Sequence, residues 1–264
     1  MNEEIKKNQK LWDQWTNINI KSKFYDLPSF LNGKNTLNEI EKDEIGLVEG
    51  LSVLHLQCHF GMDTISQARM GAKVSGVDIS EVAITKAKEL AKQLKFKVDF
   101  ILSDVYDLKK WIRKKYDLAF ASYGVISWLP DLNTWADIIS WCLKPGGTFY
   151  LVDFHPILWM LDDQLTHIQY PYDSAGSPLK FENVPSYAEP DIPLSNQEFN
   201  WHHGIGKVVN SLIQSRLQIE FLNEHFFSPY PVFSDMEEIE EGKWIHVHKK
   251  QKIPYLFSVK AKKY

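Results

Sequence analysis

The sequence contains little cysteine, no long apolar run and no strong excess of charge of either sign. Two cysteines, Cys58 and Cys142, exclude a disulfide framework and are typical of reduced thiols in a cytoplasmic protein. No segment approaches the roughly 18 to 20 consecutive apolar residues of a membrane span. The charged N-terminus, MNEEIKKNQKLWDQW, lacks the apolar centre of a signal peptide. We therefore expect a cytoplasmic protein without a membrane partner.

The charge balance and the histidine spacing exclude two further classes of protein. A net charge of −4 argues against general nucleic-acid binding, which favours a basic surface. Among nine histidines, the close pairs are His202 with His203 and His246 with His248. Neither pair lies beside a cysteine or carboxylate cluster at zinc-binding spacing, so the sequence predicts no metal site.

The chain does contain a regular alternation of apolar, strand-like segments and amphipathic, helix-like segments. The predicted helices are 3–15, 36–45, 62–70, 80–94, 133–143 and 204–214, and the predicted strands are 53–56, 74–78, 98–102, 116–121, 148–154, 217–224 and 255–261. Thr36 is the predicted N-cap of the second helix, with Glu39 completing a capping box. Such alternation favours a doubly wound α/β fold, with a parallel sheet and helices on both faces.

The pattern changes after the strand that ends at Phe154. Residues 155–200 are rich in proline, tyrosine, aspartate and serine, and they are too many for a simple connection. We expect an inserted cap with short strands, because its aromatic side chains need burial: Trp159, Tyr170, Tyr172, Phe181, Tyr187 and Phe199. Residues 225–252 are predicted to form a second cap element.

The most informative stretch runs from Val53 to Asp78. It combines a strand, a tight turn, a helix and a second strand, and it ends on an acid. In doubly wound proteins this half-unit holds the adenosine end of a cofactor, and the terminal acid accepts hydrogen bonds from the ribose hydroxyls. Asp78 is therefore the predicted ribose ligand.

The turn within this stretch distinguishes between two cofactors. A dinucleotide site needs glycines that let the backbone approach a diphosphate. Gln57 and His59 occupy two of those positions and only Gly61 remains, so the side chains would crowd a diphosphate. S-adenosylmethionine carries no phosphate, and the sequence favours it over NAD. A nicotinamide-dependent dehydrogenase and a non-catalytic module that binds S-adenosylmethionine remain as alternatives.

The segment VLHLQCHFGMDTISQARMGAKVSGVDISEVAI resembles class I S-adenosylmethionine-dependent methyltransferases, and its HLQCHFG turn is similar to that of a bacterial subgroup. The resemblance continues through SDVYDL, ASYGVISWLPDL, LKPGGTFYLVDFHP, WHHGIGKVVNSLI and IEFLNEH. It implies one Rossmann-like domain over residues 1–264, with a seven-stranded, mostly parallel sheet whose last strand is antiparallel. Within it, 1–45 would form helices over the cofactor, 46–154 the cofactor-binding core, 155–200 the substrate cap and 201–264 the C-terminal part of the sheet. The main departures are His55, in place of the usual acid, and the two missing glycines.

Ligands of such sheets bind outside the carboxyl ends of the strands. The corresponding segments here are 57–61, 78–79, 103–105, 122–124 and 153–155. The resemblance implies contacts to the amino-acid tail from the turn and an adenine clamp from Asp104 and Val105. It also implies that the N-terminal helix folds over the cofactor, so Trp15 and Tyr25 are predicted to contact the sulfonium by cation–π attraction. The predicted cofactor-binding residues are Trp15, Tyr25, Gln57, Cys58, His59, Gly61, Asp78, Ile79, Asp104, Val105 and Ser122.

The resemblance implies methyl transfer, in which alignment and exclusion of water are the protein's main tasks. A general base is needed only if the acceptor carries a proton that it must lose early. His155 is the predicted base in that case, and Tyr123 is predicted to face the methyl group or the substrate. The aromatic cap favours a small, partly apolar acceptor. The sequence leaves the acceptor atom and the oligomeric state open.

Overall fold

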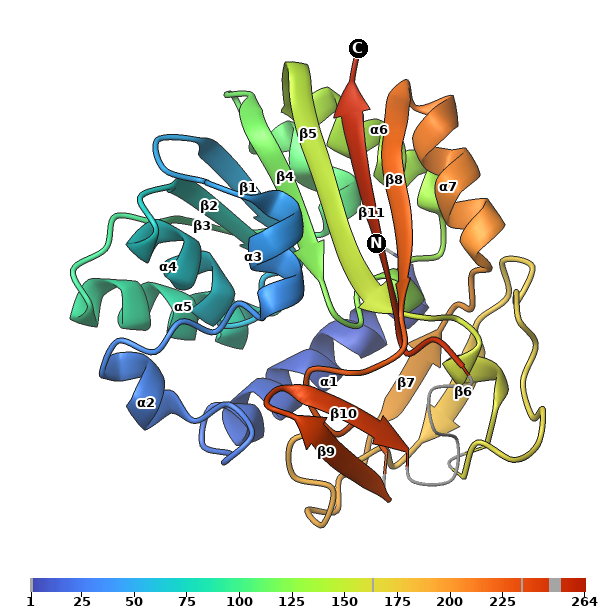
Figure 1. The fold of residues 1–264 in the computed structure, drawn as a ribbon. Coiled ribbons are helices and arrows are strands. Elements are labelled where there is room, and N and C mark those ends of the chain that lie inside the picture. The colour runs from blue at the N-terminus through green and yellow to red at the C-terminus, as the bar shows by residue number, and fades with distance from the viewer. Residues whose placement is uncertain (1, 163, 234, 247–252) are drawn as a thin grey trace.

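The structure is a computed structural model that describes residues 2–162, 164–233, 235–246 and 253–264. Its centre is a seven-stranded sheet of order β3-β2-β1-β4-β5-β11-β8 (Figure 1). The strands are β1 (Ser52–Leu56), β2 (Lys73–Asp78), β3 (Asp99–Leu102), β4 (Tyr116–Ser122), β5 (Leu143–Phe154), β8 (Leu217–His225) and β11 (Leu256–Lys263). Strands β1 to β5 pair in parallel, and β11 is antiparallel to both β5 and β8. This confirms the predicted doubly wound, mostly parallel sheet with its last strand antiparallel.

Helices cover both faces of this sheet. Successive side chains of a strand point to opposite faces, and in β1 Val53 packs in the core beside α3 whereas Leu54 packs in the core beside α6. The helices on the Val53 face are α3 (Glu39–Ile45), α4 (Met62–Arg69) and α5 (Glu81–Gln93), and those on the Leu54 face are η1 (Val105–Lys110), α6 (Leu132–Cys142) and α7 (Ile205–Gln214). Both faces are therefore buried, and the site must lie at an end of the strands.

Local capping explains where two of these helices begin. Ser80 caps α5 as predicted, because its Oγ accepts the Ala83 N–H at 3.0 Å. The predicted start of the second helix at Thr36 is wrong. Helix α3 begins at Glu39, and the Glu41 carboxylate accepts the Asn38 N–H at 3.2 Å. The Thr36 hydroxyl instead donates to Asp63 Oδ1 at 2.5 Å and ties this segment to α4.

The N-terminal helix α1 (Glu3–Asn19) is four residues longer than predicted and lies beyond the arrowheads of β4 and β5 in Figure 1. The Asn8 amide pairs with the backbone of Phe199, donating to its carbonyl at 2.7 Å and accepting its N–H at 2.9 Å. Phe199 belongs to β7 (Gln197–Asn200), so the two chain segments cover the carboxyl ends of the strands together. A short helix, α2 (Leu27–Leu31), follows α1.

The predicted inserted cap contains the short helix η3 (Leu158–Met160) and the antiparallel strands β6 (Leu179–Glu182) and β7. The expectation that all its aromatic side chains are buried is wrong. Phe199 is buried, but Tyr172 and Tyr187 are 39% and 48% exposed. Tyr172 is held at the surface by its hydroxyl, which accepts the Ile205 N–H at 3.2 Å.

The second cap element contains the antiparallel strands β9 (Met236–Glu240) and β10 (Lys243–His246). His248, which was paired with His246 in the sequence, lies outside the described residues. In the part of the chain that the structure describes, no helix is long and apolar enough to cross a membrane.

Candidate active site

The turn from β1 to α4 adopts a backbone that glycine normally supplies. Gln57 and His59 both have φ of 51°, and Gly61 has φ of 80°. The left-handed conformation costs roughly 1–2 kcal/mol for a residue with a side chain. Two backbone bonds hold the turn: Cys58 N–H donates to the Val77 carbonyl at 2.9 Å, and Gly61 N–H donates to the Cys58 carbonyl at 3.0 Å. Gln57 and His59, which stand where a dinucleotide-binding turn has glycines, therefore keep the left-handed backbone conformation and add side chains to the turn.

Asp78 at the end of β2 is hydrogen-bonded to this turn. Its Oδ2 accepts the His59 N–H at 2.7 Å, and its Oδ1 accepts the Ser80 N–H at 2.8 Å. Burial raises the pKa of Asp78 to about 6. Each oxygen has a further lone pair, so the carboxylate can accept more hydrogen bonds without releasing the turn.

Helix α1 is attached to the loop after β2. Gln9 donates its side-chain amide to the Ile79 carbonyl at 2.9 Å. Asp13 accepts the Ser80 hydroxyl at 2.6 Å and the Val82 N–H at 3.2 Å. These bonds hold α1 above Ile79. As a result, the tryptophans of α1 lie over the turn.

Aromatic rings from three distant segments gather over the turn. We call Trp12, Trp15, His59, Trp128 and Tyr187 the aromatic cluster. The ring centroid of Trp12 lies 5.2 Å from each of the ring centroids of Trp15, His59 and Trp128. The ring centroid of Trp15 lies 5.7 Å from that of Tyr187. Trp128 and Tyr187 were not among the predicted site residues. The spacing of Trp128 after the strand that ends at Ser122 is the sequence signal that could have identified it.

Three polar atoms are buried at this place without a hydrogen-bond partner among the described residues. They are Trp15 Nε1, Gln57 Oε1 and His59 Nε2. The other ring nitrogen of His59 is hydrogen-bonded to the Tyr25 hydroxyl at 3.1 Å, and burial lowers the pKa of His59 to about 3. An unpaired buried polar group costs about 1–3 kcal/mol. One N–H donor and two further polar atoms therefore suit a ligand with both donors and acceptors, such as the amino-acid tail of S-adenosylmethionine.

The predicted adenine clamp lies at the end of β3. Asp104 is buried and caps η1, because its Oδ1 accepts the Tyr106 N–H at 3.0 Å. Burial raises the pKa of Asp104. Ser103 N–H donates to the Asp78 carbonyl at 2.9 Å and joins the ends of β2 and β3. The contact of Asp104 and Val105 with adenine stays a prediction.

Tyr123 follows Ser122 at the end of β4, and its hydroxyl faces α3. The Tyr123 hydroxyl donates to Glu41 Oε2 at 2.7 Å and accepts from the Asn38 amide at 3.1 Å. The Tyr123 ring lies 6.3 Å from that of Phe154. The hydroxyl is thus held by polar partners, and its predicted place beside the methyl group stays a prediction.

His155 is held at both ring nitrogens. Its Nδ1 accepts the Ile157 N–H at 3.2 Å, so Nε2 carries the hydrogen and donates to Glu224 Oε1 at 2.9 Å. Burial lowers the pKa of His155. To act as the predicted base, His155 would first have to release Ile157.

We expect Glu41→Gln to reduce the loss of stability that accompanies rising pH. Burial raises the pKa of Glu41 from its ordinary 4.5 to about 7. Between these values the folded chain keeps a proton that the unfolded chain has released, so the free energy of unfolding falls as the pH rises. The variant should lack this fall, which amounts to about 3 kcal/mol at most. Urea unfolding across this pH range measures it, with the exposed Glu39→Gln of the same helix as control. Parallel curves for Glu41→Gln and the parent would contradict the assignment.

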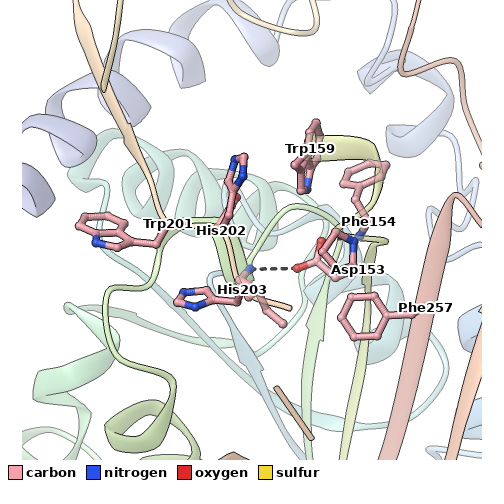
Figure 2. A pocket seen from close by; sticks show the side chains of 10 residues that line it. Asp153, Phe154, Trp159, Trp201, His202, His203 and Phe257 are labelled. Carbon is pink, nitrogen blue, oxygen red and sulfur yellow. Dashed lines mark hydrogen bonds between the residues drawn. The ribbon is translucent and has the colours of Figure 1, made fainter. Parts of the chain in front are cut away.

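A small cavity of about 20 Å³ lies beside the ends of β4 and β5. Its lining includes Asp153, Phe154, Trp159, Trp201, His202 and His203 (Figure 2). The Asp153 carboxylate accepts four hydrogen bonds, from the backbone N–H groups of Gly124, Val125, Ile126 and Phe154 at 2.5 to 3.0 Å. Within the described residues, no group of three His, Cys, Asp or Glu side chains could hold a metal ion.

Comparisons with known proteins identify a family and a shared fold. Residues 47–200 match a family model described as a methyltransferase domain. The chain is 29% identical over 132 residues to an uncharacterized methyltransferase of Synechocystis sp., covering 49% of this chain and 60% of that protein. It is 30% identical over 103 residues to a ubiquinone biosynthesis O-methyltransferase of Nitrobacter winogradskyi, covering 39% of this chain and 38% of that protein. The matches thus span less than two thirds of the length of these curated relatives.

Two solved structures share the fold. An S-adenosylmethionine dependent methyltransferase from Mesorhizobium loti has a TM-score of 0.57 at 19% identity, covering 88% of this chain and 100% of that one. A geranyl diphosphate C-methyltransferase from Streptomyces coelicolor, in complex with S-adenosyl-L-homocysteine, has a TM-score of 0.56 at 13% identity, covering 86% of this chain and 74% of that one. At these identities the likeness concerns the arrangement of helices and strands.

Proposed function

Because the chain belongs to the methyltransferase domain family, we propose that it transfers a methyl group from S-adenosylmethionine to a small-molecule acceptor. One observation carries the proposal. Asp78 lies beneath a turn of glycine-like backbone, next to three buried polar atoms that have no partner in the described part of the chain. A nucleoside with an amino-acid tail supplies the missing partners for these groups.

The cofactor-binding residues have distinct tasks in this proposal. Asp78 accepts the ribose hydroxyls, and Ile79 lies beside the ribose. Asp104 and Val105 recognise adenine. The amino-acid tail is held by the turn residues Gln57, Cys58, His59 and Gly61. Trp15 and Tyr25 contact the sulfonium by cation–π attraction, and Ser122 lies below the sulfonium at the end of β4. Residues 1–45 cover the cofactor, and residues 155–200 cover the acceptor.

Catalysis then rests on alignment and exclusion of water. The bound sulfonium supplies an activated methyl group. The aromatic cluster surrounds it with apolar surface, and well-oriented reacting pairs reach effective molarities of about 10⁵–10⁸ M. Tyr187 is about half exposed and enters from the cap, so it can move aside to admit ligands. Where the acceptor must lose a proton early, His155 takes it after releasing the Ile157 N–H, and Tyr123 faces the methyl group or the acceptor.

The acceptor is small, partly apolar and neither a nucleic acid nor a membrane component. The abundance of aromatic side chains at the strand ends supports an apolar part. The names of several relatives, which are O-methyltransferases, support an oxygen atom as the site of methylation. We also propose that the chain belongs to the bacterial subgroup with the HLQCHFG turn and acts in the cytoplasm.

Calorimetry tests the cofactor. We expect S-adenosylmethionine and S-adenosylhomocysteine to bind with micromolar affinity and NADH not to bind. A methyl-release screen over small phenols, thiols and amines then tests catalysis. Binding of NADH without binding of S-adenosylmethionine would favour a dehydrogenase, and cofactor binding without release over the whole screen would favour a non-catalytic module.

A further inference from the structure

The segment WHH (Trp201, His202, His203) supplies two imidazoles to the cavity beside β4 and β5, and neither takes part in the proposed cofactor site. Both histidines are at least nine-tenths buried, with 7% and 4% exposure. Figure 2 shows them on the side of the cavity opposite Phe154 and Phe257. Buried polar side chains of this kind need an explanation in hydrogen-bond terms.

His203 presents a lone pair that no described residue uses. Its Nε2 lies 2.6 Å from the Leu129 carbonyl oxygen, and since a carbonyl only accepts, Nε2 carries the hydrogen. The neutral ring therefore has an unprotonated Nδ1, which is buried without a partner among the described residues. Burial lowers the pKa of His203 to about 4, which keeps the ring neutral at physiological pH.

His202 has the corresponding arrangement with its nitrogens exchanged. Its Nδ1 donates to the Pro171 carbonyl at 2.8 Å, so in the neutral ring Nε2 is the acceptor. Asp153 adds negative charge to the wall, but its oxygens already accept four backbone N–H groups. These three side chains offer the cavity acceptors only, whereas Ser127, Trp159 and Trp201, which also line it, each carry an O–H or N–H donor. A neutral hydroxyl both donates and accepts, so it fits this mixed polarity.

The size and the other walls restrict the ligand further. About 20 Å³ has room for about one oxygen atom with its hydrogen. The rings of Phe154 and Trp159 lie 5.5 Å apart in edge-to-face contact beside it, and both are partly exposed. They offer flat apolar surface on which an aromatic ring can stack.

We propose that this cavity binds the hydroxyl group of an aromatic methyl acceptor, with His203 Nδ1 as the hydrogen-bond acceptor and with Phe154 and Trp159 against the ring. The proposal rests on the proposed function, and it names the substrate class and a specificity-determining residue. The hydroxyl is an anchor for recognition, and no proton is transferred in this step.

Titrations with phenol and anisole test the proposal on the full chain without cofactor. The two probes share the aromatic ring, but only phenol donates a hydrogen. Binding is followed by NMR through the His203 side chain, whose Nδ1 resonance moves when it accepts a hydrogen bond. We expect phenol to bind saturably and at least about tenfold more tightly than anisole.

The matched variant is His203→Gln. The glutamine amide can still donate to the Leu129 carbonyl, but it places no acceptor at the position of Nδ1. We expect this variant to bind phenol about tenfold more weakly than the parent, with anisole binding and S-adenosylmethionine affinity unchanged. His167→Gln is the control, because the His167 side chain is 84% exposed, and it should match the parent throughout.

Three outcomes would overturn the proposal. They are no saturable phenol binding by the parent, equal binding of phenol and anisole, or equal binding of phenol by the parent and His203→Gln. The comparison of phenol with anisole on the parent chain tests the proposal even if the variant does not fold. Failure of S-adenosylmethionine to bind would instead overturn the proposed function, which the calorimetry reports separately from the phenol titration.

Discussion

Replacing Asp78 by alanine is expected to weaken the binding of S-adenosylmethionine at least about a hundredfold. Two ribose hydroxyls would donate to the carboxylate, and a hydrogen bond to a charged group contributes about 1.5–3 kcal/mol. The loss of both therefore corresponds to about two or more powers of ten in the dissociation constant. Calorimetry of the parent and the variant measures this difference directly.

The control must separate cofactor binding from folding, because Asp78 also accepts the His59 and Ser80 N–H groups. We expect the variant to lose about 2 kcal/mol of stability and to remain folded. Asp99→Ala removes an exposed carboxylate at the opposite end of β3 and should leave the affinity unchanged. An unaltered dissociation constant in Asp78→Ala would remove the ribose assignment.

The same assignment predicts how the affinity depends on pH. Burial raises the pKa of Asp78 to about 6 in the free chain. Hydroxyl donors stabilise the charged carboxylate and lower its pKa in the complex, so the complex binds fewer protons. The affinity of the parent should therefore decrease as the pH falls through 6, and Asp78→Ala should not show this decrease. A parent affinity that is flat across this range would contradict the proposed contact.

Replacing Asp153 by alanine is expected to lower the free energy of unfolding by about 4 kcal/mol. The side chain is buried and accepts four backbone N–H groups. Each buried N–H group that loses its acceptor costs about 1–3 kcal/mol. The substitution also removes the cost of burying the carboxylate charge, so the net loss of stability is smaller than the sum over the four N–H groups. Because residues 123–126 follow β4 into the candidate site, acceptor binding should be lost as well.

Urea unfolding monitored by tryptophan fluorescence measures the effect. Asp153→Asn retains one accepting oxygen and should show about half the loss. The exposed Asp191→Ala in the cap is the control and should change stability by less than about 0.5 kcal/mol. A loss below about 1 kcal/mol in Asp153→Ala would mean that the loop does not depend on this carboxylate.

Much of the fold could be predicted because the signals are local. Ser80 before an amphipathic helix, and Asp78 at the end of an apolar strand, lie within a few residues of the features that they specify. The local sequence does not determine the start of α3, because Thr36 and Asn38 are both good N-cap residues. In the structure the Thr36 hydroxyl bonds to Asp63, and Asn38 caps the helix. Asp63 lies in another helix, and its contact with Thr36 leaves no trace in the local pattern.

The candidate site likewise combines features that the local sequence indicates with features that depend on contacts between distant residues. The turn 57–61 was identified from its spacing, but its positive φ angles at Gln57 and His59 are visible only in the structure. Trp128 and Tyr187 contact Trp12 over the turn from separate chain segments. The local periodicity of the sequence carries no information on contacts between such distant segments. The unshared lone pair of His203 depends on a contact with Leu129, 74 residues away.

The sequence by itself determined the succession of strands and helices, the acid at the end of the second strand and the absence of a diphosphate-binding glycine turn. Periodicity, capping and turn chemistry act over a few residues, so one chain segment is enough to express them. The tertiary structure alone decided the order of the strands, the rings that cover the turn and the buried polar atoms that remain without partners. These features depend on contacts between residues far apart in the chain, which form only when the two faces of the sheet are packed.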